Sequence, residues 1–317
     1  EILSGLVGSE MCIRDRQDMT PRSPRIVRRL ATACLSLYDR AAAARTWHLP
    51  SRCRICQHWP QRTLCDRCVQ AFGEAFARCR TCAQRLPDTG DAAAVQDWCV
   101  DCLRVPSPLD FALACRDYAY PWSGLAARLK FADDLGLARS LGRMMTATPG
   151  LRAQLADADW VVPLPLSDQR QRERGYNQAE ALARAMLAHA PRLLRPRMNT
   201  GLLRRVLHTD PQHARSRDDR LARLRDAYRV PPHAAALVDG RHILLVDDVM
   251  TTGATLAAAT RALRLAGAAQ VGALVLARAL TADDEAQAPQ DAGTRDNAGP
   301  CSISSSSTPK SRPTRAT

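Results

Sequence analysis

Lysine is nearly absent from this sequence, and aromatic residues are scarce. The 317 residues include two lysines, Lys130 and Lys310, and aromatic residues make up 4%. The sequence also lacks any apolar run near the roughly 20 residues that span a bilayer. Its first residues do not show the basic segment followed by an apolar one that marks a secretory signal. We therefore expect no transmembrane segment and a cytoplasmic protein.

Positive charge is abundant, and it comes almost entirely from arginine. The formal net charge is +13, and 46% of the residues are hydrophobic, which is ordinary for a globular protein. An excess of positive charge suits an anionic partner, either a nucleic acid or a polyphosphate substrate. A GC-rich genome would also produce many arginines and alanines, and this explanation stays open beside the functional one.

Both ends of the chain differ from the middle in composition. Residues 1–18 resemble the peptide that a sequencing-library adapter would encode, and we expect a non-native leader there. Residues 19–50 carry apolar residues at helical spacing, which predicts an N-terminal amphipathic helix that packs on its own domain or lies on a membrane surface. Residues 281–317 are rich in Ser, Pro, Ala and charge without periodicity, so we expect a disordered tail.

Eight of the twelve cysteines form four CxxC pairs between residues 51 and 104. Two residues between cysteines let both sulfurs face one tetrahedral ion, and four pairs this close together favour structural zinc over an iron–sulfur site or a redox dithiol. Eight thiols suit two zinc ions. The first four and the last four cysteines are the simplest grouping, although the spacing leaves an interleaved grouping open. The expected ligands are Cys53, Cys56, Cys65, Cys68, Cys79, Cys82, Cys99 and Cys102. We predict a double zinc ribbon over residues 51–104 in which metal ligation supplies the folding free energy.

The composition of residues 105–280 shifts to Leu, Ala and Val, and strand patterns alternate with helix patterns. Short apolar runs predict buried strands at residues 159–165, 242–248 and 269–278. Apolar residues at helical spacing predict helices at residues 175–190 and 254–268. Strands that alternate with helices pair in parallel through right-handed crossovers, so the sequence predicts an α/β domain.

The segment VDDVMTTGAT, residues 246–255, follows the apolar run of the second strand. Ligands bind at the carboxyl edge of α/β sheets, where Asp247 and Asp248 are expected to lie. Small residues that lead into a helix N-terminus can surround a phosphate with backbone N–H groups. The candidates are Thr251, Thr252, Gly253 and Thr255. Because two acids would repel a phosphate unless they bind something else, the pattern favours a sugar phosphate whose hydroxyls meet the acids.

Two other interpretations of this segment are weaker. A receiver domain of two-component signalling also begins with a similar strand, but it needs a lysine later in the same domain, and the only later lysine is Lys310. A simple helix cap accounts for one acid and leaves the second unexplained. The loop also lacks the GK[ST] ending of a nucleoside-triphosphate P-loop.

Three motifs in one order resemble the ComF family. They are the four CxxC pairs, the stretch VVPLPLSDQRQRERGYNQAEALA, and VDDVMTTGAT, which looks like the phosphoribosyl-pyrophosphate motif of type I phosphoribosyltransferases. The resemblance covers roughly residues 27–280. It implies a type I phosphoribosyltransferase-like parallel sheet flanked by helices, preceded by a small double zinc-ribbon module.

The resemblance also implies roles for single residues. Asp247 and Asp248 would be the catalytic acids that contact ribose hydroxyls, and the loop of Thr251, Thr252, Gly253, Ala254 and Thr255 would hold the 5′-phosphate. The segment that faces the pyrophosphate would be Pro163-Leu164-Pro165 together with Arg172 and Arg174. Lys130 resembles a substrate-binding lysine of the family near the start of this domain. Residues 204–220 would form a mobile hood over the site, and Arg205, Thr209 and Gln212 match its pattern. Arg223 and Phe131 depart from the family pattern and leave the acceptor side less defined.

Two functions follow from these expectations. The first is a phosphoribosyltransferase that uses phosphoribosyl pyrophosphate with Mg²⁺. The second is a non-catalytic competence factor that binds single-stranded DNA, meets the DNA-uptake machinery and uses the sugar-phosphate site as a sensor. Trp47, Trp59 and Trp98 lie in or beside the cysteine module and weakly favour the second, because bases stack on aromatic rings. The sequence gives no motif for an acceptor substrate.

Overall fold

The computed structural model describes residues 51–59, 61–74, 76–87, 97–131, 135–206 and 227–281. All of them fall within one compact unit of the chain, residues 48–317. The expected leader, the expected amphipathic helix, most of the expected hood and almost all of the expected tail lie outside the described residues, as do Trp47 and Arg223.

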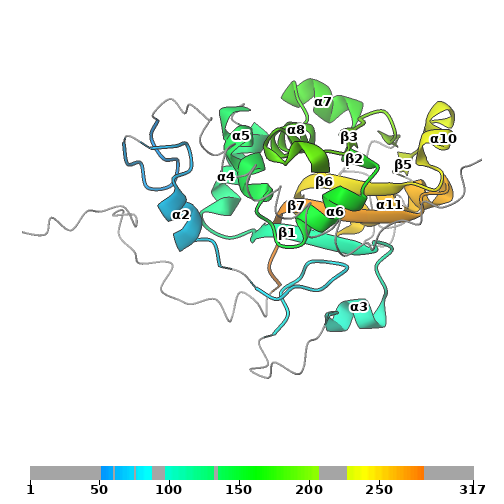
Figure 1. The fold of residues 1–317 in the computed structure, drawn as a ribbon, viewed down its shortest axis with the longest axis horizontal. Coiled ribbons are helices and arrows are strands. Elements are labelled where there is room, and N and C mark those ends of the chain that lie inside the picture. The colour runs from blue at the N-terminus through cyan, green and yellow to red at the C-terminus, as the bar shows by residue number, and fades with distance from the viewer. Residues whose placement is uncertain are drawn as a thin grey trace, which may run out of the picture. The chain divides into compact units, whose positions relative to one another are not determined.

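A five-stranded parallel sheet forms the centre of the described chain (Figure 1). Its strand order is β1-β7-β6-β2-β3, and every pairing in it is parallel. The strands are β1 (Phe111–Asp117), β2 (Trp160–Pro163), β3 (Arg197–Met198), β6 (His242–Met250) and β7 (Gln270–Arg278). A separate antiparallel pair consists of β4 (Arg204–Arg205) and β5 (Tyr228–Arg229).

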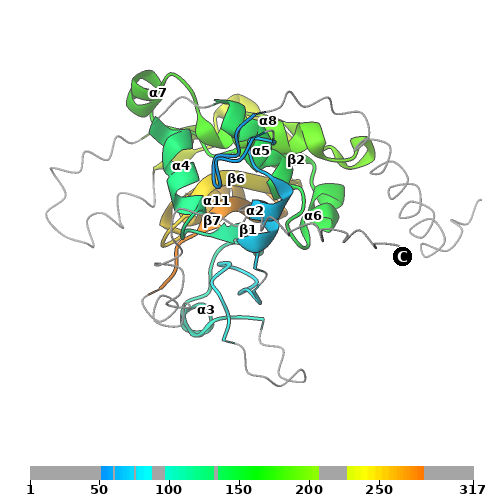
Figure 2. The ribbon, with the colours of Figure 1, turned by 90° about the vertical axis from the view of Figure 1, so that its left-hand side faces the viewer.

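Helices cover both faces of the sheet. Figures 1 and 2 both draw α4 (Trp122–Phe131), α5 (Leu135–Met145) and α8 (Gln178–His189) on one side, where their apolar residues form one buried cluster with α6 (Leu151–Asp157). The second buried cluster contains α11 (Ala254–Leu265) together with α10 (Ala235–Val238). The remaining short helices are α2 (Asp66–Ala71), α3 (Val100–Arg104), α7 (Asp168–Arg174), η1 (Arg192–Leu194) and η3 (Pro232–Ala234).

The strands are apolar runs because both of their faces are buried. Along β6, Leu244 and Val246 belong to the first cluster, whereas Ile243 and Leu245 belong to the second. This alternation follows from the two-residue period of a strand. The expected α/β class with a parallel sheet between helices is confirmed.

Two features differ from the expectation. The strand β6 runs to Met250, so Asp247 and Asp248 lie within its last residues, and Asp247 still pairs with Val275 of β7. The edge strand β1 has no counterpart among the expected strands. Its sequence FALACRD is short, and its character as a strand comes from pairing along β7 from Phe111 to Asp117.

Candidate functional site

The two acids at the carboxyl end of β6 occupy different environments. Asp248 is 4% exposed, and Asp247 is partly buried. The Asp248 backbone N–H donates to Asp247 Oδ1 at 2.9 Å, and the Val249 N–H donates to Asp248 Oδ1 at 2.8 Å. Adjacent backbone N–H groups therefore fix both carboxylates at the end of the central strand.

Lys130, in the last turn of α4, reaches the same acids. Its Nζ lies 3.2 Å from Asp248 Oδ2. Desolvation, and then the charge of Asp248, raise the pKa of Asp247 well above its usual value, while Lys130 acts in the opposite direction. Two neighbouring carboxylates with one ammonium group suit a partner that donates hydrogen bonds or brings positive charge.

The candidate phosphate loop, residues 251–255 and called the phosphate loop below, turns from β6 into α11. Gly253 is the N-cap of α11 and has φ +75°, a left-handed conformation that favours glycine. Thr251 and Thr252 are exposed, and Thr252 Oγ1 accepts from the Ala254 N–H at 3.4 Å. The first backbone N–H groups of a helix lack intrahelical partners and favour an anion. The loop and the acidic pair thus lie next to one another at the carboxyl end of β6.

The motif RGYN connects three segments around this site. The Tyr176 hydroxyl donates to the carbonyl of Leu129, directly before Lys130. Asn177 donates from Nδ2 to the carbonyl of Leu164 at 3.0 Å, and its Oδ1 accepts from the Ala179 N–H at 2.9 Å as the N-cap of α8. These bonds hold the end of α4 and the turn after β2. The sequence predicts a helix over residues 175–190, but it gives no signal for the two longer-range bonds.

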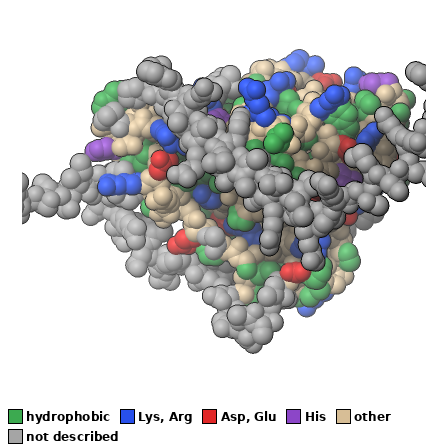
Figure 3. Space-filling model, in the orientation of Figure 1, with side chains coloured by type: hydrophobic (Ala, Val, Ile, Leu, Met, Phe, Trp, Pro, Cys, Tyr) green, Lys and Arg blue, Asp and Glu red, His purple; other side chains and the backbone are tan. Residues whose placement is uncertain are grey.

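The arginines expected to face pyrophosphate lie on α7, directly after the turn that follows β2. Arg172 is exposed and Arg174 is partly buried. Because β2 neighbours β6 in the sheet, topology places α7 at the same edge as the acids. Lys and Arg side chains, blue in Figure 3, gather along the upper part of that view, where Figure 1 draws α7.

Tyr228 contacts the described base of the expected hood, and the sequence gives no signal for this contact. It is a buried residue of β5, and the Arg205 guanidinium lies 5.7 Å from the centre of its ring. Burial raises the pKa of Tyr228 to about 12, and the charges of Arg205 and Asp247 act on it in opposite directions. The described base of the expected hood therefore packs on Tyr228 through Arg205.

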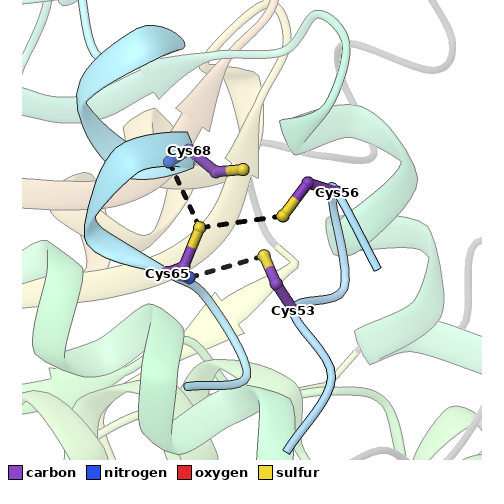
Figure 4. Close-up of side chains that lie close together, drawn as sticks. All are labelled: Cys53, Cys56, Cys65 and Cys68. Atoms are coloured by element: carbon purple, nitrogen blue, oxygen red, sulfur yellow. Dashed lines mark hydrogen bonds between the residues drawn. The ribbon is translucent and has the colours of Figure 1, made fainter. Parts of the chain in front are cut away.

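The eight CxxC cysteines form two clusters. In each cluster the four sulfurs lie within 4.8 Å of one another. The first cluster is Cys53, Cys56, Cys65 and Cys68, shown in Figure 4, and the second cluster is Cys79, Cys82, Cys99 and Cys102. The grouping follows chain order and is not interleaved.

The geometry of both clusters fits a tetrahedral metal ion. Sulfurs about 2.3 Å from a zinc ion would be about 3.8 Å apart, and the sulfurs of Cys56 and Cys65 are 3.8 Å apart, those of Cys82 and Cys99 3.6 Å. These distances are too long for disulfides, and all the described cysteines are free thiols. In each cluster four cysteine ligands would leave no open coordination position, so the fit is to structural zinc.

Burial and crowding shift the acidity of these thiols. Burial raises the pKa of Cys65 to about 12 and that of Cys102 to about 11. A hydrogen bond from Cys82 lowers the pKa of Cys79 to about 3. Because thiolates are the ligands, metal binding must displace protons from the other thiols.

None of the helices in the described chain has the length and apolar character needed to cross a membrane.

Comparison with known proteins defines the class of this chain. The family of the phosphoribosyl transferase domain matches residues 164–298. A phosphoribosyltransferase-type domain therefore follows the two four-cysteine clusters.

Three relatives define the family. DNA utilization protein YhgH of Escherichia coli strain K12 is 31% identical over 245 residues, which cover 73% of this chain and 99% of that protein. Competence protein F of Haemophilus influenzae is 30% identical over 72% of this chain and 95% of its own length. Competence protein ComFC of Bacillus subtilis is 38% identical over 37% of this chain and 44% of its length. The chain belongs to the ComF family.

One similar solved structure is glutamine phosphoribosylpyrophosphate amidotransferase from B. subtilis, complexed with ADP and GMP. The match covers 47% of this chain and 30% of that enzyme's chain. Its identity is 17% and its TM-score is 0.30, so this likeness is too weak to build on.

Proposed function

We propose that this protein binds phosphoribosyl pyrophosphate or a closely similar sugar phosphate, together with Mg²⁺, and acts in the uptake or use of DNA. The observation that carries the proposal is the position of two largely buried acids at the carboxyl edge of the sheet, one short loop before a helix N-terminus that is capped by glycine. The relatives named for competence and DNA utilization support the cellular setting.

Each part of the site has a chemical role in this proposal. Asp247 and Asp248 accept hydrogen bonds from the ribose hydroxyls. The N–H groups of the phosphate loop, with the hydroxyls of Thr251 and Thr255, bind the 5′-phosphate. Lys130 balances the charge of the acids before the sugar arrives. Arg172 and Arg174 on α7 supply positive charge for the pyrophosphate.

Catalysis, if an acceptor is present, rests on positioning and charge stabilisation. Mg²⁺ when bound would neutralise the leaving pyrophosphate, and the chain's own residues would orient the ribose. The reaction class is transfer of a phosphoribosyl group, a glycosyl transfer of pentosyl type. No described residue identifies the acceptor.

A thermal-shift series tests ligand binding. A ligand that binds only the folded state raises the melting temperature by an amount that grows with the logarithm of its concentration relative to its dissociation constant. We expect phosphoribosyl pyrophosphate with Mg²⁺ to raise it more than ribose 5-phosphate or pyrophosphate alone, because neither fills both halves of the site. Equal shifts with pyrophosphate alone would show that the acids and the phosphate loop do not form one pocket.

A second proposal is a binding protein for single-stranded DNA without turnover. In the cysteine module, Trp59 is 55% exposed and Trp98 is 39% exposed, and exposed rings can stack on bases. Affinity for single-stranded DNA should then fall steeply with salt. Absence of DNA binding at low salt would exclude this role, and pyrophosphate release with any acceptor would establish the enzyme. The cytoplasmic location stays a prediction.

A further inference from the structure

Arg278, the last residue of β7, connects the second cysteine cluster to the phosphate loop. It is 8% exposed. Its Nε donates to the carbonyl of Cys82 at 2.9 Å. Its Nη1 donates to the carbonyls of Met250 at 3.2 Å and Thr251 at 2.5 Å, where the chain leaves β6 for the loop. One buried guanidinium thus bonds a cysteine of the second cluster and the first residues of the loop.

The ends of three strands hold Arg278 in place. The Tyr118 N–H, directly after β1, donates to the Arg278 carbonyl at 2.7 Å. The Ala279 N–H donates to the Met250 carbonyl at 2.9 Å, and Arg278 Nη1 also donates to the Ala279 carbonyl at 2.8 Å. Because its backbone is fixed in this way, Arg278 has little freedom to place its guanidinium on other acceptors if the Cys82 carbonyl moves.

A second buried charge fastens the same cysteine hairpin to the same edge of the sheet. Asp117, the register partner of Arg278 across β1 and β7, is buried. It accepts from Arg85 at 2.8 Å through Nε, and its Oδ1 lies 2.9 Å from Arg78 Nη2. Arg78 and Arg85 pair as an antiparallel bridge and enclose Cys79 and Cys82. The hairpin is therefore held at the carboxyl edge from both sides.

The first cluster packs in a different place. Ile55, Val69 and Phe72 lie against the apolar cluster that contains α4 and α5. The indole Nε1 of Trp122, at the start of α4, donates to the Phe72 carbonyl at 2.9 Å. The two clusters thus provide an internal comparison, because the Arg278 bonds reach only a residue of the second.

We propose that the second cluster, when it holds its metal, sets the conformation of the phosphate loop through Arg278. Metal ligation fixes the backbone at Cys82, the Cys82 carbonyl orients Arg278, and Arg278 fixes the Met250 and Thr251 carbonyls. The loop then presents its N–H groups in one arrangement. Metal occupancy of the second cluster and anion binding at the loop are consequently coupled, and the coupling acts equally in both directions.

The proposal has two halves. The conformational half, that the second cluster sets the conformation of the phosphate loop, is independent of any ligand. The anion half, that metal occupancy and anion binding are coupled, rests on the proposed function. Hydrogen–deuterium exchange of the zinc-loaded full chain therefore tests the first half without ligand. The measured quantity is amide exchange in a peptide that covers residues 249–257, whose hydrogen-bonded amides, such as the Ala257 N–H on the Gly253 carbonyl, report the conformation of the phosphate loop. We expect Arg278→Met to speed that exchange about tenfold, a typical size for coupling between sites.

Arg264→Met is the matched control. Arg264 also binds two carbonyls, those of Ala268 and Ala269, and pairs with Asp110. These partners precede β7 and β1, so Arg264 lies at the opposite edge of the sheet. Exchange in the phosphate loop should stay at the wild-type rate in this variant. Equal loop exchange in the two variants would overturn the proposal.

Cysteine variants test the metal side. Cys102→Ser removes a ligand of the second cluster and Cys56→Ser removes one of the first, and both residues are partly buried. The loop should loosen in Cys102→Ser and stay protected in Cys56→Ser. If variants fail to fold, chelator removal of zinc from the wild type and the milder Arg278→Lys give the same test. A loop that stays protected after zinc is removed would overturn the proposal.

The anion half is tested by zinc release to a coloured chelator. In the wild type, phosphoribosyl pyrophosphate with Mg²⁺ should slow the release of one zinc equivalent and leave the release rate of the other unchanged. In Arg278→Met, the ligand should slow neither release. If the wild type does not bind the sugar phosphate, the proposed function fails, while the exchange experiment still decides whether Arg278 couples cluster and loop. Binding that leaves both release rates unchanged would refute the coupling itself.

Discussion

Replacing Lys130 with methionine should destabilise the folded domain, because its ammonium group pairs with one of two adjacent, largely buried carboxylates. The charges of Lys130 and Asp248 lie 3.2 Å apart. At an effective dielectric constant of about 20, such a pair attracts with about 5 kcal/mol. Desolvation of both groups offsets part of this attraction. Removing one partner of a buried pair still costs several kcal/mol, because the other charge is left uncompensated.

We expect the free energy of unfolding to fall by about 2–4 kcal/mol at neutral pH. This is less than the cost of breaking a fully buried pair, because the Lys130 side chain is itself 25% exposed. For a domain of this size the loss corresponds to a fall in melting temperature of about 5–12 °C. Arg128→Met is the matched control, since Arg128 is an exposed basic residue of the same helix. Its effect should stay within about 0.5 kcal/mol.

The loss should depend on pH with a definite sign. The pKa of Asp247 is raised in the folded state, so the folded protein binds this proton more readily than the unfolded chain does. A raised carboxyl pKa lowers stability as the pH rises through it. The penalty of Lys130→Met should therefore be largest at alkaline pH and shrink as the pH is lowered through the raised pKa of Asp247, when a proton replaces the missing cation.

Urea unfolding of the variants and the wild type at several pH values provides the measurement. The double variant Lys130→Met with Asp248→Asn should recover most of the stability, because it removes the uncompensated charge. If Lys130→Met is as stable as Arg128→Met at alkaline pH, or if its penalty does not change with pH, the electrostatic reasoning about the acidic pair is wrong.

Three further predictions concern other parts of the molecule. The purified chain should contain two zinc equivalents by elemental analysis, and the Cys82→Ser variant should retain one. Unchanged zinc content in that variant would contradict zinc binding by the second cluster. Asn177→Ala should cost about 2 kcal/mol in urea unfolding, from the lost N-cap and the lost bond to the turn after β2, whereas Gln169→Ala on the exposed face of α7 should change stability by less than about 0.5 kcal/mol. Gly253→Ala should lower the free energy of unfolding by about 1 kcal/mol, because alanine is strained at φ +75°. Gly124→Ala is its control: an added Cβ there meets nothing within 4 Å, so alanine should stabilise α4 by about 0.5–1 kcal/mol. Equal effects of the two substitutions would contradict the geometry of the loop.

The parts of the fold that could be predicted are those with local causes. β6 and β7 are continuous apolar runs because both faces are buried, and such runs stand out in a sequence. The cysteine clusters follow from CxxC spacing, which brings two sulfurs to one point. The phosphate loop is recognisable because small residues and a glycine directly precede a helix.

The parts that could not be predicted depend on contacts between distant segments. β1 becomes a strand through its partner β7, and its own sequence has charged residues at the end. The ion pair of Lys130 with Asp248 joins a helix end to a strand far along the chain. In the sequence, Arg278 is simply the last residue of an apolar run. Its position between Cys82 and the phosphate loop becomes visible only in the folded chain.

Titration calorimetry with phosphoribosyl pyrophosphate and Mg²⁺ tests the central claim most directly. The account predicts saturable binding of one ligand per chain, weakened at least about tenfold in Asp247→Asn and in Gly253→Ala and unchanged in Arg128→Met, because the acids and the loop would bind opposite ends of one ligand. Absence of binding to the wild type, or equal affinity in all four proteins, would contradict it.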